Sequence, residues 1–113
     1  MNNIELLNKY DFHDSLLDSL SYNYETKELR LEIDFCNWKQ VGYDENSPET
    51  SIISLIFGNV SDVIIPDFSI NSDEIIEFVM LEQGTGVKIV VFSDITKTTY
   101  EIVILSNDFE ILK

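Results

Sequence analysis

The side chains that most often carry catalysis are scarce in this sequence, which has one histidine, His13, and one cysteine, Cys36. A zinc site built from these two would lack two ligands of the favoured types. Asp34 lies close to Cys36 in sequence and disfavours the thiolate that nucleophilic chemistry needs. The chain has no Gly-x-Ser-x-Gly elbow, and Gly84 and Gly86 fall in a predicted hairpin turn and not before a helix. The sequence therefore predicts no catalytic residue and no enzyme.

Metal chemistry would have to use carboxylates. His13-Asp14 has the form of a metal-binding dipeptide in phosphohydrolases, but such sites take further His ligands that this chain does not have. The loop around Asp44 has oxygen ligands for calcium without the spacing or the glycine of a calcium-binding loop. We expect no metal and no cofactor. An enzyme with a metal held by carboxylates around Asp14 and Asp18 stays open as a less favoured alternative.

A short helix is predicted at the start of the chain. Asn2 or Asn3 can cap its first turn, and Ile4, Leu7 and Tyr10 share one face. A helix this short is marginal alone, so we expect it to pack on other elements.

The rest of the sequence alternates between apolar and polar residues, as strands with one buried face do. The clearest strand is Leu29–Cys36, whereas Asp18 interrupts the apolar side of the strand before it. Both a helix and a strand fit Ser72–Gln83, and its β-branched and aromatic residues favour the strand. Strands are predicted within residues 15–24, 29–36, 52–57, 60–65, 72–83, 87–93, 98–105 and 109–112.

These patterns predict the fold class. The 113 residues suffice for a single domain with a real core. We expect residues 1–113 to form an α+β, mostly β domain of about seven short strands with a short N-terminal helix. The strands would form an antiparallel meander or a sandwich-like pair of layers, and the sequence does not decide between the two.

Charge limits the classes of partner. The chain has 21 acidic and seven basic residues, for a net charge of −14. Such a surface repels nucleic acid and anionic membranes, so we expect neither to be a partner. It favours encounter with a basic protein. Charge of this kind also serves solubility alone, since the acids are scattered along the chain.

The cytoplasm is the expected location. A lone cysteine forms no disulfide within the chain. The first residues have neither the basic nor the apolar region of a secretory signal. The apolar runs fall well short of the ~20 residues of a membrane-spanning helix.

Two segments of this sequence resemble a family of short bacterial proteins. The first is Phe12-His13-Asp14-Ser15, which is followed by an apolar strand and a hairpin, and the second is Ile56–Ile65, with Phe68 and Asn71 after it. This pattern is similar to the polymorphic-toxin immunity proteins catalogued as immunity protein fifty. Asp11 stands where that family usually has Pro, and the family's Trp-containing first helix is absent here.

The resemblance implies a function without catalysis. Members of such families neutralise toxins that neighbouring cells deliver, so we predict a binding protein that occludes a basic toxin domain. The alternative from another class is a structural subunit or homo-oligomer joined through an open sheet edge. The identity of the toxin, the surface that binds it and the oligomeric state do not follow from the sequence.

Aromatic and acidic residues after the second strand are the predicted partner-binding site. Trp38 and Tyr43 flank the acidic loop at Asp44 and Glu45, which offers buried area and a counter-charge for Lys or Arg. His13 is the further candidate, if it faces the partner. The opposing interpretations are that Trp38 closes the core, that Tyr43 is a loop spacer, and that Phe12–Ser15 is chiefly structural. In that structural role Phe12 anchors the core, and His13 and Asp14 satisfy free backbone groups.

Overall fold

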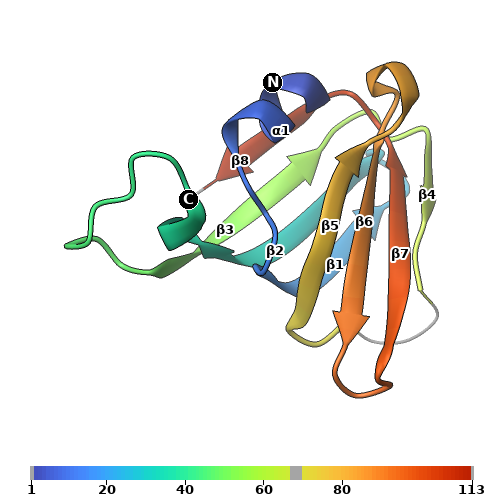
Figure 1. Cartoon of the computed structure of the whole chain (residues 1–113). Coiled ribbons are helices and arrows are strands. Elements are labelled where there is room, and N and C mark those ends of the chain that lie inside the picture. Colours follow the sequence, from blue (N-terminus) through green and yellow to red (C-terminus); the bar gives the residue numbers. More distant parts are fainter. Residues whose placement is uncertain (1, 67–69, 113) are drawn as a thin grey trace.

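The fold is described from a computed structural model, which covers residues 2–66 and 70–112 (Figure 1). One α-helix, two short 3-10 helices and eight strands lie within these residues. In chain order they are α1 (Asn3–Lys9), β1 (Leu16–Asn23), β2 (Glu28–Cys36), η1 (Asn37–Lys39), β3 (Thr50–Phe57), β4 (Asp62–Ile64), β5 (Asp73–Met80), η2 (Glu82–Gly84), β6 (Val87–Ser93), β7 (Thr98–Leu105) and β8 (Phe109–Leu112).

All eight strands belong to one antiparallel sheet in the order β4-β7-β6-β5-β1-β2-β3-β8. Its two halves meet where β1 pairs with β5, and this pairing contains only Leu16 with Glu74 and Leu17 with Asp73. A bulge in β1 follows at once. Bulges bend a strand and end its pairing, so the sheet turns a corner here. Figure 1 accordingly shows β5, β6 and β7 running across β1 and β2.

The corner lets both halves bury their apolar side chains in one core. On β2 the buried residues alternate, with Leu29, Leu31 and Ile33 inaccessible to solvent. On β6 the same alternation buries Val87, Ile89 and Val91, and all of these residues belong to one cluster. The two halves of one curled sheet therefore form two layers around a single core. The domain is sandwich-like in its packing, although all its strands belong to one sheet.

The helix α1 is fixed by its polar first turn. The Asn2 side chain caps it by accepting a hydrogen bond from the backbone N–H of Glu5 at 2.9 Å. The amide Nδ2 of buried Asn3 donates to the carbonyl oxygens of Ser106 and Gly84, at 2.7 and 3.1 Å. The helix therefore begins attached to the connections that leave β5 and β7.

The predicted fold class is confirmed, with eight strands in place of about seven. Ser72–Gln83 is mainly strand, as its β-branched residues predict, and Asn2 is the helix cap. The predicted buried face of α1 is wrong in part, because Ile4 is half-exposed and Leu6 is buried. Leu7 and Tyr10 are partly buried against the core.

Asp18, which interrupted the apolar pattern, lies in the bulge of β1. The extra residue restores the alternation beyond it, so Leu20 and Tyr22 pack against the core. The Asp18 carboxylate accepts a hydrogen bond from the Ser72 hydroxyl at 2.9 Å.

A buried carboxyl–phenol pair stabilises the start of β5 against β7. The Tyr100 hydroxyl donates to Asp73 Oδ2 at 2.6 Å, and the two residues are 9% and 3% exposed. Burial raises the pKa of the Tyr100 hydroxyl far above its usual value, and the bond to Asp73 raises it further. The phenol therefore stays protonated and keeps donating throughout the ordinary pH range.

We expect the substitution Tyr100→Phe to lower the free energy of unfolding by about 1.5–3 kcal/mol, the range for hydrogen bonds to charged groups. Urea denaturation monitored by circular dichroism measures this change. Tyr24→Phe is the matched control, because Tyr24 is 69% exposed. The control should cost no more than about 0.5 kcal/mol, and equal effects of the two substitutions would contradict the role of the pair.

Candidate partner-binding site

Residues 11–15 extend the junction between the two halves of the sheet. The Asp14 N–H donates to the Ile75 carbonyl at 2.9 Å, and the Ile75 N–H donates to the Ser15 carbonyl at 2.8 Å. The buried hydroxyl Oγ of Ser15 accepts the N–H of Cys36 at 3.0 Å. Asp14 has a left-handed backbone, with φ at 70°, which non-glycine residues adopt at a cost. This turn brings the chain from α1 into β1.

Phe12 anchors the same segment in the core. Its side chain is 2% exposed, and its ring centroid lies 4.6 Å from that of Phe78 on β5 and 5.4 Å from that of Phe35 on β2. The Tyr10 ring lies 6.2 Å away at the end of α1. The expected burial of Phe12 is confirmed, and the ring joins both halves of the sheet.

The expected backbone role of His13 and Asp14 is wrong. The side chains that bind backbone groups of this turn are those of Asp11, whose carboxylate accepts the His13 N–H at 3.0 Å, and of Gln40, which bonds to the N–H and the carbonyl of Asp11. The turn places the His13 and Asp14 side chains toward solvent, where they meet Lys39 from η1.

His13, Asp14, Lys39 and Glu74 form a polar group at the junction, here called the His13 cluster. Lys39 Nζ lies 3.1 Å from His13 Nδ1 and 3.3 Å from Asp14 Oδ2. His13 Nδ1 in turn lies 3.3 Å from Asp14 Oδ1. Lys39 Nζ also lies 5.7 Å from the centre of the Trp38 ring. The lysine therefore connects the turn at the start of β1 to η1.

The two carboxyl groups of the cluster affect each other. A hydrogen bond from Glu74 lowers the pKa of Asp14, and Lys39 and His13 lower it further. The same hydrogen bond to Asp14 raises the pKa of Glu74, and partial burial adds to the rise. Asp14 is thus the carboxylate that holds Lys39, and Glu74 is the one that more readily keeps a proton.

Gln40 fixes the next loop to the same turn. Its side-chain oxygen accepts the Asp11 N–H at 2.9 Å, and its Nε2 donates to the carbonyls of Asp11 and Cys36 at 2.7 and 2.9 Å. The Gln40 side chain thus links the backbone of the N-terminal segment to the backbone at the end of β2, where the two segments do not pair as strands. Nothing in its sequence context distinguishes Gln40, and sequence reasoning missed it together with Lys39 and Glu74.

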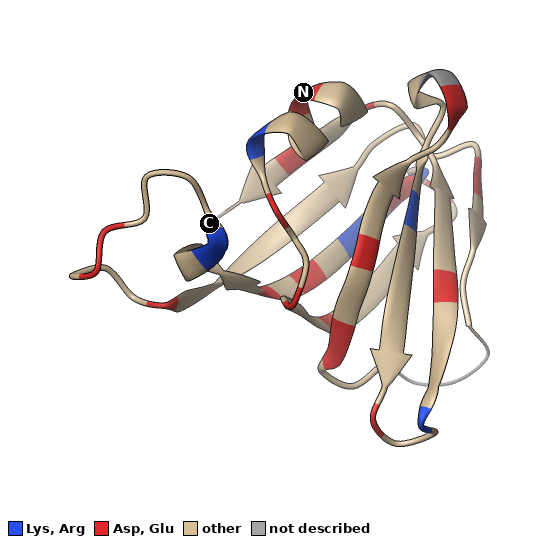
Figure 2. Cartoon of the chain, viewed as in Figure 1, with Lys and Arg blue, Asp and Glu red and all other residues tan. Residues whose placement is uncertain are grey.

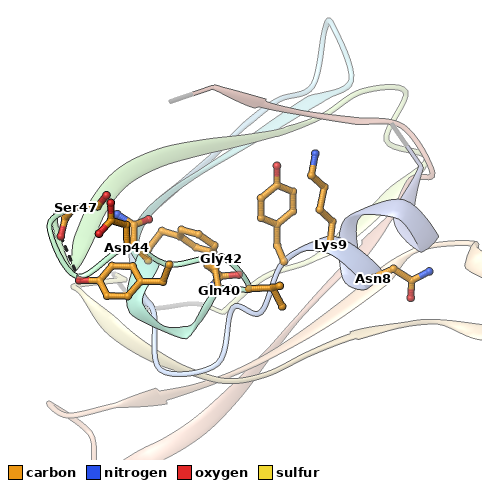
Figure 3. A pocket seen from close by; sticks show the side chains of 11 residues that line it. Asn8, Lys9, Gln40, Gly42, Asp44 and Ser47 are labelled. Atoms are coloured by element: carbon orange, nitrogen blue, oxygen red, sulfur yellow. Dashed lines mark hydrogen bonds between the residues drawn. The ribbon is translucent and has the colours of Figure 1, made fainter.

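A cleft of about 750 Å³ opens between the end of α1 and the loop that follows η1 (Figure 3). Phe35 and Tyr10 supply aromatic surface, and Tyr43 and Asp44 come from the loop. The Tyr43 hydroxyl donates to the Ser47 carbonyl at 3.2 Å, while the Asp44 carboxylate accepts the Asn46 N–H at 3.0 Å. The remaining lining residues are Asn8, Lys9, Asn37, Gln40, Val41, Gly42 and Ser47.

The predicted partner-binding residues gather at one end of the molecule. Tyr43 and Asp44 line the cleft, Glu45 is exposed beside them, and His13 lies across Lys39 from Trp38. Trp38 is 49% exposed, so the interpretation that it closes the core is wrong. Through Lys39 the structure thus connects Trp38 to the lone histidine, which the sequence separates by 25 residues.

Unbalanced acidic charge marks this end. Four of the cations in the described part of the chain are in ion pairs, namely Arg30, Lys39, Lys88 and Lys97. None of the ion pairs found there involves Asp44, Glu45 or Glu49. Figure 2 shows acidic residues along the protruding loop, with blue confined to its base. The loop therefore presents carboxylates that no bound cation neutralises.

The second segment that resembles the immunity family lies far from the cleft. It crosses from β3 to β4, where the Gly58 N–H donates to the Asp108 carbonyl at 2.8 Å and Ser106 Oγ donates to the Gly58 carbonyl at 2.6 Å. The Val60 N–H donates to the Lys27 carbonyl at 2.9 Å. The two bonds of Gly58 fix the β3–β4 connection to the β7–β8 connection, and the bond of Val60 fixes it to the β1–β2 turn. Phe68 lies outside the described residues.

Comparison with family models, curated proteins and solved structures finds no match for this chain. The site must therefore be interpreted from its own geometry. No helix of the described residues is both long and apolar enough to cross a membrane. Within residues 2–66 and 70–112, no three His, Cys, Asp or Glu side chains are grouped so that they could hold a metal ion. Asp18, which the carboxylate-metal alternative paired with Asp14, is bonded to Ser72.

Phe12→Ala should lower the free energy of unfolding by ~3–5 kcal/mol, because it leaves a cavity among the rings that join the two halves of the sheet. Thermal and urea denaturation measure the loss. Ile95→Ala, which shortens a side chain that is 71% exposed, is the control and should stay within about 0.5 kcal/mol of wild type. A Phe12→Ala protein as stable as that control would disprove the anchor.

Glu74→Gln should stabilise the protein at pH 7 and leave it unchanged at pH 4. Since the folded pKa of Glu74 is raised, its contribution is present below the ordinary value of 4.5 and is lost as pH rises through the folded value. Gln keeps a donor toward Asp14 at every pH. Because both carboxyl groups are partly exposed to solvent, screening keeps the gain small.

Denaturation at the two pH values measures the effect of Glu74→Gln. Glu77→Gln is the matched control, since Glu77 is exposed on the same strand. A gain that is equal at pH 4 and pH 7, or equal in the control, would contradict the shared proton.

Proposed function

We propose that this chain is a cytosolic, non-catalytic binding protein, an immunity protein that neutralises a basic toxin domain by covering it. The observation that carries the proposal is the composition of one end of the molecule. There Tyr43 and Asp44 line a cleft of about 750 Å³, and the half-exposed Trp38 and the exposed Glu45 are chain neighbours of its lining residues. Aromatic anchors beside acidic groups suit a surface rich in Lys and Arg.

The aromatic part of this surface supports binding by contact area. An exposed Trp on a fixed helical turn loses little conformational freedom when a partner covers it. Trp38 is the second residue of η1, whose end Gln40 fixes to the N-terminal segment. A partner side chain entering the cleft would meet Phe35 and Tyr10, which are already ordered by the core.

The acidic part supports fast and selective encounter. A net charge of −14 sets up a long-range attraction for cations, which salt screens beyond ~8 Å at physiological ionic strength. Lys39, which lies over the Trp38 ring, is paired with Asp14, so it does not oppose a basic partner as a free charge would, and Lys9 is the cation that lines the cleft itself. Complementary charge then directs the basic face of the toxin to this end.

An alternative role, as a homo-oligomeric subunit, would use the two outer strands of the sheet. β4 and β8 are open at its two edges and are three and four residues long. Short edges are one means by which proteins avoid such pairing, and the like charge of two copies opposes it. Mass measurement in solution separates this alternative from the proposal, and metal titration separates a carboxylate-metal enzyme from both.

The test uses the variable C-terminal domain of the large secreted protein that we expect the neighbouring gene to encode. Binding kinetics at about 50 and 200 mM salt should show an association rate that falls several-fold, with a smaller change in dissociation. Trp38→Ala and Tyr43→Ala should each weaken binding by at least about 1 kcal/mol, as truncated anchors do. Co-expression with the toxin domain should rescue growth.

Ile95→Ala is the matched control, because Ile95 is an exposed apolar residue, 71% accessible, on a distant hairpin turn. It should bind like wild type. An acidic partner, or an association rate that ignores salt, would remove the electrostatic part of the proposal. Unchanged binding by both aromatic variants would show that the partner uses another surface.

A further inference from the structure

Although β1 is an inner strand of the sheet, one side of its second half is not paired with a strand of the described residues. This side is here called the free edge. Residues 19–23 of β1 all pair with β2, from Ser19 with Glu32 to Asn23 with Glu28. On the other side, β5 pairs only with Leu16 and Leu17. The described part of the chain thus supplies no strand partner to β1 beyond its bulge.

The bulge causes this separation. Asp18 lies outside the regular register of β1, and its carboxylate accepts a hydrogen bond from the Ser72 hydroxyl just before β5. The pairing between β1 and β5 therefore ends at the corner of the sheet. In an antiparallel strand, alternate residues direct both backbone N–H and C=O groups to the same side. Alternate residues among 19–23 therefore direct these groups away from β2 and toward the free edge.

This edge has few of the devices that block strand addition. Proteins usually protect edges with Lys, Pro or a very short strand. The free segment is Ser19-Leu20-Ser21-Tyr22-Asn23, which contains no charged residue and no proline. Its five residues exceed the three of β4 and the four of β8. By these criteria it is the best-suited of the three edges to accept another strand.

A hollow of about 690 Å³ lies along the same segment, lined by residues 21–25 with Glu28 and Arg30. The rings of Tyr22 and Tyr24 form a corner there, with centroids 4.5 Å apart and planes at 61°. Tyr24 is 69% exposed. Aromatic faces beside carboxylates bind the stems and charges of Lys and Arg.

Arg30, the cation among the residues that line the hollow, is bonded to side chains of the neighbouring strand positions. Arg30 Nε donates to Glu32 Oε1 at 2.6 Å, and its guanidinium donates to Ser54 Oγ at 3.0 Å. Glu25 and Glu28 form no ion pair with the cations of the described residues. The hollow is therefore acidic and aromatic, like the cleft at the other end of the molecule.

We propose that an extended, basic segment of a partner protein adds to this free edge as a further strand. Its backbone would pair with residues 19–23, and its Lys or Arg side chains would lie over Tyr24 toward Glu25 and Glu28. Charge selects this occupant over a second copy of the chain, because two copies would each bring a net charge of −14. The site is separate from the cleft and does not depend on the proposed immunity function.

The probe is a capped seven-residue peptide in which Val alternates with Lys or Arg, titrated into the isotope-labelled full chain. We expect amide NMR shifts centred on residues 19–24 and slower hydrogen exchange at the alternate amides that face the edge. Two control peptides keep the length, one with alternate backbone nitrogens methylated and one with Glu in place of Lys and Arg. Both should bind at least tenfold more weakly.

Tyr24→Ala should weaken binding of the basic peptide about three- to fivefold, the range of an exposed cation–π contact. Ile95→Ala, on the other long hairpin, should not change it. Trp38→Ala should also leave it unchanged, which separates this site from the cleft.

Three results would overturn the proposal. One is that the alternate edge amides already exchange slowly in the free monomer, since the edge would then be covered within the chain itself. Another is equal binding of the methylated peptide, because backbone pairing would then play no part. The last is a dimer in sedimentation with the same amides protected, which would make a second copy the occupant.

Discussion

The short junction between β1 and β5 is the constraint on which the remaining structure depends. Two residue pairs and the backbone bonds of Asp14 and Ser15 to Ile75 are the pairing that connects the two halves of the sheet at this corner. Each half would expose an apolar face alone, and burying both faces against each other is the dominant gain of folding. A corner of this kind needs a bulge beside it and a sharp turn before it. Asp18 and the left-handed Asp14 meet these needs.

The junction also explains why the candidate side chains of the His13 cluster lie close together. The backbone of the turn that leads into β1 bonds inward to Ile75, while the side chains of His13 and Asp14 lie toward solvent. Lys39 meets them because β2 ends beside the same turn and continues into η1. An ion pair this exposed contributes little stability. The orientation of η1 relative to the turn is instead fixed by Gln40, whose side chain bonds to the backbone of Asp11 and Cys36.

Much of the fold could be predicted from the sequence because its signals are local. The alternation along Leu29–Cys36 depends on the period of a strand, and the same is true of β5 and β6. The corner could not be predicted, since Asp18 interrupts the pattern equally well as a bulge or as a misplaced polar residue. The candidate site could be predicted only in part, because residue types can be read from the sequence and long-range contacts cannot. Trp38 and Tyr43 are conspicuous by residue type, whereas Gln40 acts through contacts across 29 residues of sequence.

The two proposed binding surfaces follow from one property of the sheet. A sheet that turns a corner frees strand ends on both sides of the corner, and those ends need cover from other segments. On one side α1 and the loop after η1 supply that cover incompletely, which leaves the cleft beside Tyr43. On the other side β1 continues past β5, and no strand of the described residues pairs with its free side. Both openings carry tyrosine rings and unpaired carboxylates, so the acidic charge is placed where backbone or aromatic surface is accessible. These carboxylates support the proposed recognition of a basic protein.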